Sequence, residues 1–265
     1  MTVALVTGGG RGVGRVIAEA LAAEGFAVGV AARTGAEVEE AAAAITAGGG
    51  RALALTADVT DPDEVAGALG KAREQLGPID VLVNNAGTAR AIGPVWEVDP
   101  DEWWGDVDVS LRGAFACSRA VLPEMLERGS GRILNVSSYV ALRPTPYISG
   151  YAAAKAAILS LTEAMAASVE GTGVHVFALT PGLFRSELMR HLMSSEAGRR
   201  WLPGLGEGGR WVEPERVARL AVFFASGEGD AFHGRFLHAL DDLDELVARS
   251  EEIQRDDLFT PRLRR

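Results

Sequence analysis

Cysteine and metal-ligand patterns are scarce in this chain. Cys117 is the only cysteine in 265 residues, so an intramolecular disulfide is excluded and a reducing compartment is expected. The four histidines are scattered without the spacing of metal ligands. No apolar run approaches the roughly 18 residues of a membrane-spanning helix, and no basic segment precedes the first apolar run as in a signal peptide. We therefore expect a cytoplasmic protein with no metal and no membrane partner.

Positive charge is also in short supply. The chain has 26 basic and 36 acidic residues, a net charge of -10, which argues against a nucleic-acid partner. Lysine is rarer still, because only Lys71 and Lys155 occur and every other basic residue is arginine. An ammonium is a compact point charge that differs chemically from a guanidinium, so Lys155 is a candidate for a specific role.

Apolar runs and helical segments alternate along the chain. Strands are predicted at residues 3–6, 27–32, 51–56, 79–83, 132–136, 174–179 and 235–240, with helices between them, including one long helix over 100–128. No repeat or linker divides residues 1–265, and 48% hydrophobic content is enough for one packed core. This pattern predicts a single α/β domain: a three-layer, Rossmann-type, doubly wound parallel sheet of about seven strands, with ligands at the carboxyl ends of the strands.

A glycine-rich turn follows the first strand. Gly8, Gly12 and Gly14 lie between that strand and a helix, where glycines allow the backbone to approach a phosphate at the helix N-terminus. A purely structural turn is the alternative. The second strand ends in Arg33-Thr34, with no acidic residue before Glu37 to hold a ribose hydroxyl. With Arg11 in the turn, this favours NADP over NAD, unless Arg33 is simply a solvated strand-end residue.

Tyr151 and Lys155 lie four residues apart in an alanine-rich, helical segment, so both side chains are expected on one helix face. A fixed ammonium near a phenol favours the phenolate, and we expect it to lower the tyrosine pKa toward neutrality. Ser138 follows the apolar run 132–136 and is expected beside the same site. The alternative is a half-buried ring with a solvated amine.

Residues 183–211 lose the regular pattern and contain Met189, Met193, Trp201 and Trp211. They suit a mobile, apolar lid over a substrate, although an ordinary surface excursion is equally compatible. Tyr139, Leu142, Arg143 and Tyr147 are expected to shape the same pocket. Residues 241–265 read as a charged helix and tail.

Taken together, these motifs resemble the short-chain dehydrogenase/reductase family over nearly the whole chain. The family's glycine motif matches Thr7 to Gly14, its Asn-Asn-Ala-Gly motif matches Asn84 to Gly87, and its Pro-Gly motif matches Pro181-Gly182. Its Tyr-x-x-x-Lys pair matches Tyr151 and Lys155, with Ser138 at the usual separation of 13 residues before Tyr151. The resemblance implies hydride transfer with a nicotinamide cofactor and a homodimer or homotetramer.

The resemblance also implies residue roles. Tyr151 would protonate a carbonyl oxygen, Lys155 would lower the phenol pKa and bind the nicotinamide ribose, and Ser138 would polarise the carbonyl. The residues implied to bind the cofactor are Gly8, Arg11, Gly12, Val13, Gly14, Arg33, Thr34, Asp58, Val59, Asn85, Ala86, Gly87, Tyr151, Lys155, Pro181 and Gly182. Asp58 and Val59 would touch the adenine, unless Asp58 is only a helix cap.

Two features depart from the family pattern. Many members carry an asparagine on the long helix that supports the proton relay, whereas this chain has Ser110 there, with a single hydroxyl. The usual Asp-Gly-Gly segment after the last strand is absent, and a tail that covers a neighbouring subunit is one prediction. The leading hypothesis is an NADP(H)-dependent carbonyl reductase or alcohol dehydrogenase acting on a small or medium, apolar-bodied substrate. The alternatives are a catalytically silent NADP(H)-binding sensor and a non-redox, epimerase-type member of the fold.

Overall fold

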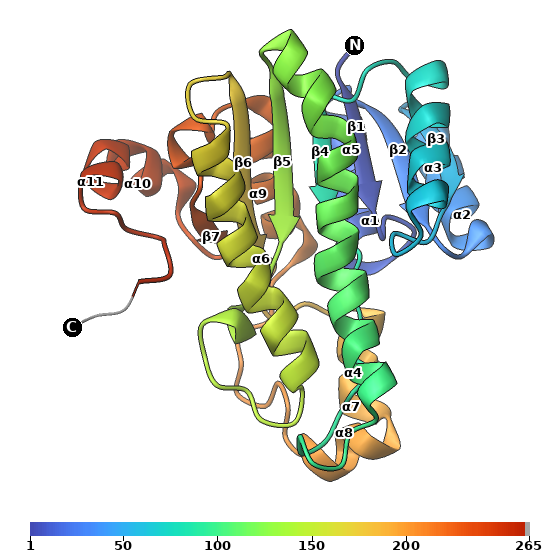
Figure 1. Cartoon of the computed structure of the whole chain (residues 1–265), viewed down its shortest axis with the longest axis vertical. Helices are drawn as coiled ribbons and strands as arrows, with labels where there is room; N and C mark the ends of the chain where they lie inside the picture. Colours follow the sequence, from blue (N-terminus) through green and yellow to red (C-terminus); the bar gives the residue numbers. More distant parts are fainter. Residues whose placement is uncertain (263–265) are drawn as a thin grey trace.

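The computed structural model describes residues 1–262 and confirms the predicted fold class. Within these residues seven strands form one all-parallel sheet in the order β3-β2-β1-β4-β5-β6-β7 (Figure 1). The single domain is built around this sheet. The strands are β1 (Val3–Thr7), β2 (Ala27–Ala32), β3 (Arg51–Thr56), β4 (Val81–Asn84), β5 (Gly131–Val136), β6 (Val174–Thr180) and β7 (Phe236–His238).

Helices cover both faces of the sheet, which explains why the strands are nearly continuous apolar runs. One core cluster joins the sheet to α1 (Gly12–Ala23), α2 (Gly35–Ala47) and α9 (Pro214–Ser226). The other joins it to α3 (Pro62–Gln75), α5 (Gly113–Arg128) and α6 (Ser149–Ser168), which lie in front of the sheet in Figure 1. Cys117 lies buried in the second cluster, and burial raises the pKa of its thiol to about 12.

The strand order reverses between β1 and β4, which pair side by side although two strands separate them in the chain. In doubly wound sheets this reversal opens a crevice at the carboxyl ends of the strands. The segment 183–211 lies beyond those ends (Figure 1) and contains α7 (Glu187–Ser194) and α8 (Glu196–Trp201). Short helical turns η2 (Tyr139–Ala141) and η3 (Asp230–Phe232) complete the connections.

The predicted long helix over 100–128 is interrupted. It consists of α4 (Pro100–Val107), a π-helical turn η1 (Asp108–Arg112) that contains Ser110, and α5. At Gly113 an added Cβ would lie 2.6 Å from Val59 Cγ2, so the helix packs closely on the chain after β3. The last strand is also shorter than predicted, because the Asp241 N–H donates to the His238 carbonyl and forms a turn.

The C-terminal segment contains α10 (Leu243–Ala248) and α11 (Ser250–Arg255) and then folds back on its own chain. The Phe236 N–H donates to the Phe259 carbonyl at 2.9 Å, and Arg262 pairs with Glu163 of α6 at 2.6 Å. The tail therefore packs on its own chain up to residue 262, its contact with a neighbouring subunit stays a prediction, and residues 263–265 lie outside the described range. Among residues 1–262, no helix is long and apolar enough to cross a membrane.

Candidate active site

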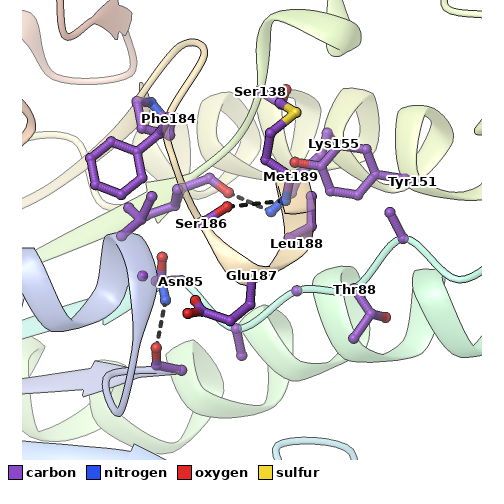
Figure 2. Close-up of a pocket in the computed structure, with 18 of the residues that line it drawn as sticks. Asn85, Thr88, Ser138, Tyr151, Lys155, Phe184, Ser186, Glu187, Leu188 and Met189 are labelled. Carbon is purple, nitrogen blue, oxygen red and sulfur yellow. Dashed lines mark hydrogen bonds between the residues drawn. The ribbon is translucent and has the colours of Figure 1, made fainter. Parts of the chain in front are cut away.

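A cavity of about 910 Å³ opens at the carboxyl ends of the strands, where the sheet reverses (Figure 2). It brings together segments that are far apart in sequence, from the glycine turn to the Pro-Gly motif. Of the predicted site residues, all except Gly14 and Ser110 line it. Those that do are Gly8, Arg11, Gly12, Val13, Arg33, Thr34, Asp58, Val59, Asn85, Ala86, Gly87, Ser138, Tyr151, Lys155, Pro181 and Gly182.

The glycine turn is shaped for close approach of another group. Gly8 and Gly12 adopt φ values of 62° and 56°, a conformation that favours glycine. Gly14 lies beneath the turn, where an added Cβ would be 2.2 Å from the Gly8 carbonyl oxygen and 2.4 Å from Asn85 Nδ2. Asn85 Nδ2 in turn donates to the carbonyls of Thr7 and Gly8, at 2.9 and 3.1 Å. The turn and the Asn-Asn-Ala-Gly motif therefore form one rigid cradle suited to a diphosphate.

Both arginines predicted to bind a 2′-phosphate already have carboxylate partners. Arg11 pairs with Glu37 at 3.1 Å, and Arg33 lies 3.6 Å from Asp58. Burial would raise the pKa of Asp58, but hydrogen bonds from Thr60 and the Arg33 guanidinium outweigh it and hold that pKa below its ordinary value. A phosphate at this position would compete with these carboxylates for the two guanidinium groups.

Ser138, Tyr151 and Lys155 gather at one side of the cavity (Figure 2). Lys155 is buried, and its Nζ lies 5.6 Å from the centroid of the Tyr151 ring and donates to the Val136 carbonyl at 2.7 Å. Burial lowers the pKa of Lys155 to about 8. The half-buried phenol of Tyr151 therefore shares the cavity with the ammonium, as the four-residue spacing predicted.

The expected lowering of the tyrosine pKa is not found. Burial raises the pKa of Tyr151, the Ser138 hydroxyl lowers it by hydrogen bonding, and the Asp106 carboxylate raises it again. Burial is the largest of these effects, and the net direction is upward. The phenol in this structure is held in its protonated form.

Ser110 lies behind the cavity wall rather than in it. Its hydroxyl is buried and has no hydrogen-bond partner within residues 1–262. A Cβ added to Gly87 would lie 3.3 Å from this hydroxyl and 3.4 Å from Lys155 Nζ, so both groups lie against Gly87. The structure therefore places Ser110 and the lysine at the same glycine, and the Ser110 hydroxyl can still form a hydrogen bond.

Asp106 was not predicted from the sequence. Its fully buried carboxylate accepts hydrogen bonds from Thr88 Oγ1 at 2.8 Å and from the N–H groups of Arg90 and Ala91, at 2.9 and 3.1 Å. These bonds fix the loop that follows the Asn-Asn-Ala-Gly motif and borders the cavity. No local sequence pattern signals this role, because the partners lie 15 to 18 residues away.

The segment 183–211 closes part of the cavity, but not with the residues expected. Met189 lines it, whereas Met193 is exposed, Trp201 packs on Tyr147 and Trp211 stacks with Arg185. Ser186 and Glu187 reach across to Gly12, where an added Cβ would lie 3.4 Å from each (Figure 2 shows Glu187 and Met189). Of the residues after Ser138, Tyr139 and Arg143 line the cavity and Leu142 and Tyr147 do not.

Comparison with known proteins identifies the family. The model of the short chain dehydrogenase family matches residues 2–197. A short chain dehydrogenase of Pseudocercospora fijiensis is 43% identical over 70% of this chain, which covers 60% of that protein's length. Gluconate 5-dehydrogenase of Gluconobacter oxydans is 33% identical over 88% of this chain and 91% of its own.

Solved structures give the same result. A gluconate 5-dehydrogenase from Burkholderia cenocepacia, in complex with NADP and tartrate, superposes with a TM-score of 0.80 at 34% identity, covering 89% of this chain and 92% of that one. Residues of the family's sequence motifs thus line one cavity of this chain, which has the family's fold. This chain belongs to the short chain dehydrogenase family of oxidoreductases.

Proposed function

We propose that this protein is an NADP(H)-dependent oxidoreductase that interconverts a carbonyl compound and an alcohol. One observation carries the proposal: Ser138, Tyr151 and Lys155 share a single cavity with the glycine cradle. A nicotinamide cofactor bound in this cradle supplies the hydride. The residues of the chain bind and orient the two ligands and move the proton.

The direction of the tyrosine pKa supports a role as proton donor. Because burial keeps the Tyr151 phenol protonated, it can give a proton to a carbonyl oxygen that gains a hydride at its carbon. Ser138 donates a hydrogen bond to the same oxygen and polarises it. Lys155, whose pKa of about 8 leaves it mostly protonated near pH 7, stabilises the phenolate that remains.

NADP remains the proposed cofactor because Arg33 and Thr34 line the cavity where an acidic residue would hold the ribose of NAD. The relatives include proteins associated with either cofactor. The Burkholderia structure holds NADP, whereas 2-dehydro-3-deoxy-L-rhamnonate dehydrogenase of a Sphingomonas strain carries NAD(+) in its name. Fluorescence titration with NADPH and NADH tests the choice. Arg33→Ala should weaken NADPH binding and leave NADH binding nearly unchanged.

The catalytic assignment is tested with Tyr151→Phe, which removes only the hydroxyl. Loss of general acid catalysis predicts a decrease of roughly 100-fold or more in the rate of NADPH-dependent ketone reduction, with NADPH binding retained. Tyr147→Phe is the matched control, since Tyr147 does not line the cavity. Full turnover in Tyr151→Phe would refute the assignment.

A cofactor-binding protein without turnover is the second candidate, and the unpartnered hydroxyl of Ser110 is the observation that favours it. Such a protein would bind NADPH but consume none with any of a panel of ketones. An epimerase-type reaction would convert substrate without net consumption of NADPH.

We also propose a homodimer or homotetramer in the cytoplasm, with the segment 183–211 acting as a lid over the substrate.

A further inference from the structure

We propose that the substrate carries an anionic group, a carboxylate or phosphate, that binds to a cationic wall formed by Tyr139, Arg143, Arg210 and His238. All four line the cavity. The inference rests on the proposed function in taking this cavity as the substrate site. It adds one charged end to the apolar-bodied substrate that is expected from the sequence.

Three of these side chains pack in a row, and Arg210 lines the same cavity, although the four come from three parts of the chain. The Arg143 guanidinium lies 4.7 Å over the Tyr139 ring, and that ring meets His238 edge-on at 6.2 Å between centroids. Arg210 lies close enough to His238 for its charge to act on the imidazole. Tyr139 directly follows Ser138, so the wall begins beside the hydroxyl proposed to hold the carbonyl.

The acidic residues that line the cavity leave the two arginines of this wall unpaired, although the Asp241 carboxylate lies next to His238. Three acidic residues line the cavity, and each pairs with another lining arginine: Glu37 with Arg11, Asp58 with Arg33 and Glu187 with Arg190. In the part of the chain that the structure describes, Arg143 and Arg210 form no ion pair. A chain with a net charge of -10 thus leaves two guanidinium groups free at one side of a cleft, where they attract an anion. Guanidinium groups also match carboxylate and phosphate oxygens geometrically.

His238 adds a donor to this wall. Its Nδ1 accepts a hydrogen bond from the Leu240 N–H at 2.9 Å, so a neutral ring carries its proton on Nε2. Nε2 is near the Pro-Gly motif, since a Cβ added to Gly182 would lie 2.9 Å from it. Burial lowers the pKa of His238, Asp241 raises it and Arg210 lowers it, with a net decrease that keeps the ring neutral near pH 7.

The phosphates of a bound cofactor would not lie against these cationic side chains. Arg11 and Arg33 follow β1 and β2, whereas Tyr139 and Arg143 follow β5, and His238 ends β7. In the order β3-β2-β1-β4-β5-β6-β7, these two sets lie on opposite sides of β4. A nucleotide on the β1–β2 side therefore leaves the cationic wall available to a second, anionic molecule.

Titration calorimetry on the full chain with saturating NADP⁺ tests the inference without turnover. The probes are acetoacetate, 4-oxopentanoate and 5-oxohexanoate, each against its methyl ester, and dihydroxyacetone phosphate against dihydroxyacetone. The keto acids separate ketone and carboxylate by increasing lengths, and the phosphate pair identifies which anion is preferred. At least one anion should bind more tightly than its neutral counterpart.

The variant Arg143→Gln/Arg210→Gln should weaken binding of that anion by roughly 10-fold or more, the usual effect of losing a hydrogen bond to a charged group. Arg216→Gln is the matched control, an exposed arginine outside the cavity, and should change nothing. If no anion binds more tightly than its neutral partner, or if the double variant binds as the wild type does, the inference is wrong. Whether these ketones consume NADPH is a separate measurement that bears only on the proposed function.

Discussion

At the scale of single residues, Lys155 combines a buried position with a charge. The spacing from Tyr151 predicts that the two side chains meet, and they do share one cavity. The spacing does not predict the direction of the tyrosine pKa, which depends on burial, on the Ser138 hydroxyl and on the Asp106 carboxylate. These are tertiary properties that no four-residue pattern contains.

Because the pKa of Lys155 is about 8 in the folded chain and near 10.5 when exposed, the unfolded state binds more protons between these values. Stability should therefore rise with pH across this window. We expect the free energy of unfolding of the wild type to rise by up to about 3 kcal/mol relative to Lys155→Met between pH 8 and pH 10.5. Urea unfolding at several pH values, without added nucleotide, measures it, and a difference independent of pH would contradict it.

The Asp106 carboxylate acts on the same tyrosine. Its carboxylate raises the pKa of Tyr151, so Asp106→Asn should lower that pKa and move the phenolate-dependent limb of alcohol oxidation to lower pH. The loss of an acceptor for the loop N–H groups should also destabilise the fold by roughly 1–3 kcal/mol. The pH profile of kcat/KM tests the shift. Asp108→Asn, the same charge change on the Asp108–Arg112 surface pair, should leave the profile in place.

At the scale of elements, strand and helix types follow from the alternating apolar pattern, and their ends differ by a few residues. The π-helical turn at residues 108–112 was missed, because the sequence there is compatible with a regular helix. The close contact between Gly113 and the Val59 side chain shows that α5 packs tightly on a segment distant in sequence. Sequence periodicity describes one element at a time and carries no information about such a contact.

The glycine cradle yields a prediction about one element. In Gly14→Ala the new methyl group would meet the Gly8 carbonyl and the Asn85 amide, which should destabilise the fold by roughly 1–3 kcal/mol and weaken NADPH binding. Gly67→Ala is the control, since Gly67 is exposed on α3 with no atom within 4 Å of an added Cβ. That substitution should stabilise the helix by about 0.5–1 kcal/mol. Thermal unfolding and fluorescence titration compare the two.

At the scale of the whole molecule, the net charge does not describe the local charge of the cavity. A value of -10 argues against nucleic-acid partners, yet it hides the positively charged cavity formed by Arg143, Arg210 and their neighbours. The position of a charge depends on which loops the sheet brings together. The alternation of elements predicts a parallel sheet, but only the structure gives the order that places β5 and β7 near one cleft wall.

The expected homo-oligomer has a candidate interface where α4, η1, α5 and α6 meet. Phe115 is 51% exposed and borders a depression with Val107, Leu111 and Leu161, at whose edge Asp108 and Arg112 form an ion pair. If a second copy covers this face, Phe115→Glu should shift the protein toward monomer in size-exclusion chromatography with light scattering. Val95→Glu, at an exposed valine outside this face, is the control. An unchanged molar mass in Phe115→Glu would exclude this interface.

The burial of Cys117 between α5 and the sheet has a practical consequence for any of these measurements. A thiol with a pKa raised to about 12 and no access to solvent cannot react with an alkylating reagent while the helix lies on the sheet. The alkylation rate therefore reports how readily that helix–sheet contact opens. The rate at which the single cysteine is alkylated thus measures local unfolding of this part of the protein, and no label needs to be introduced on the surface.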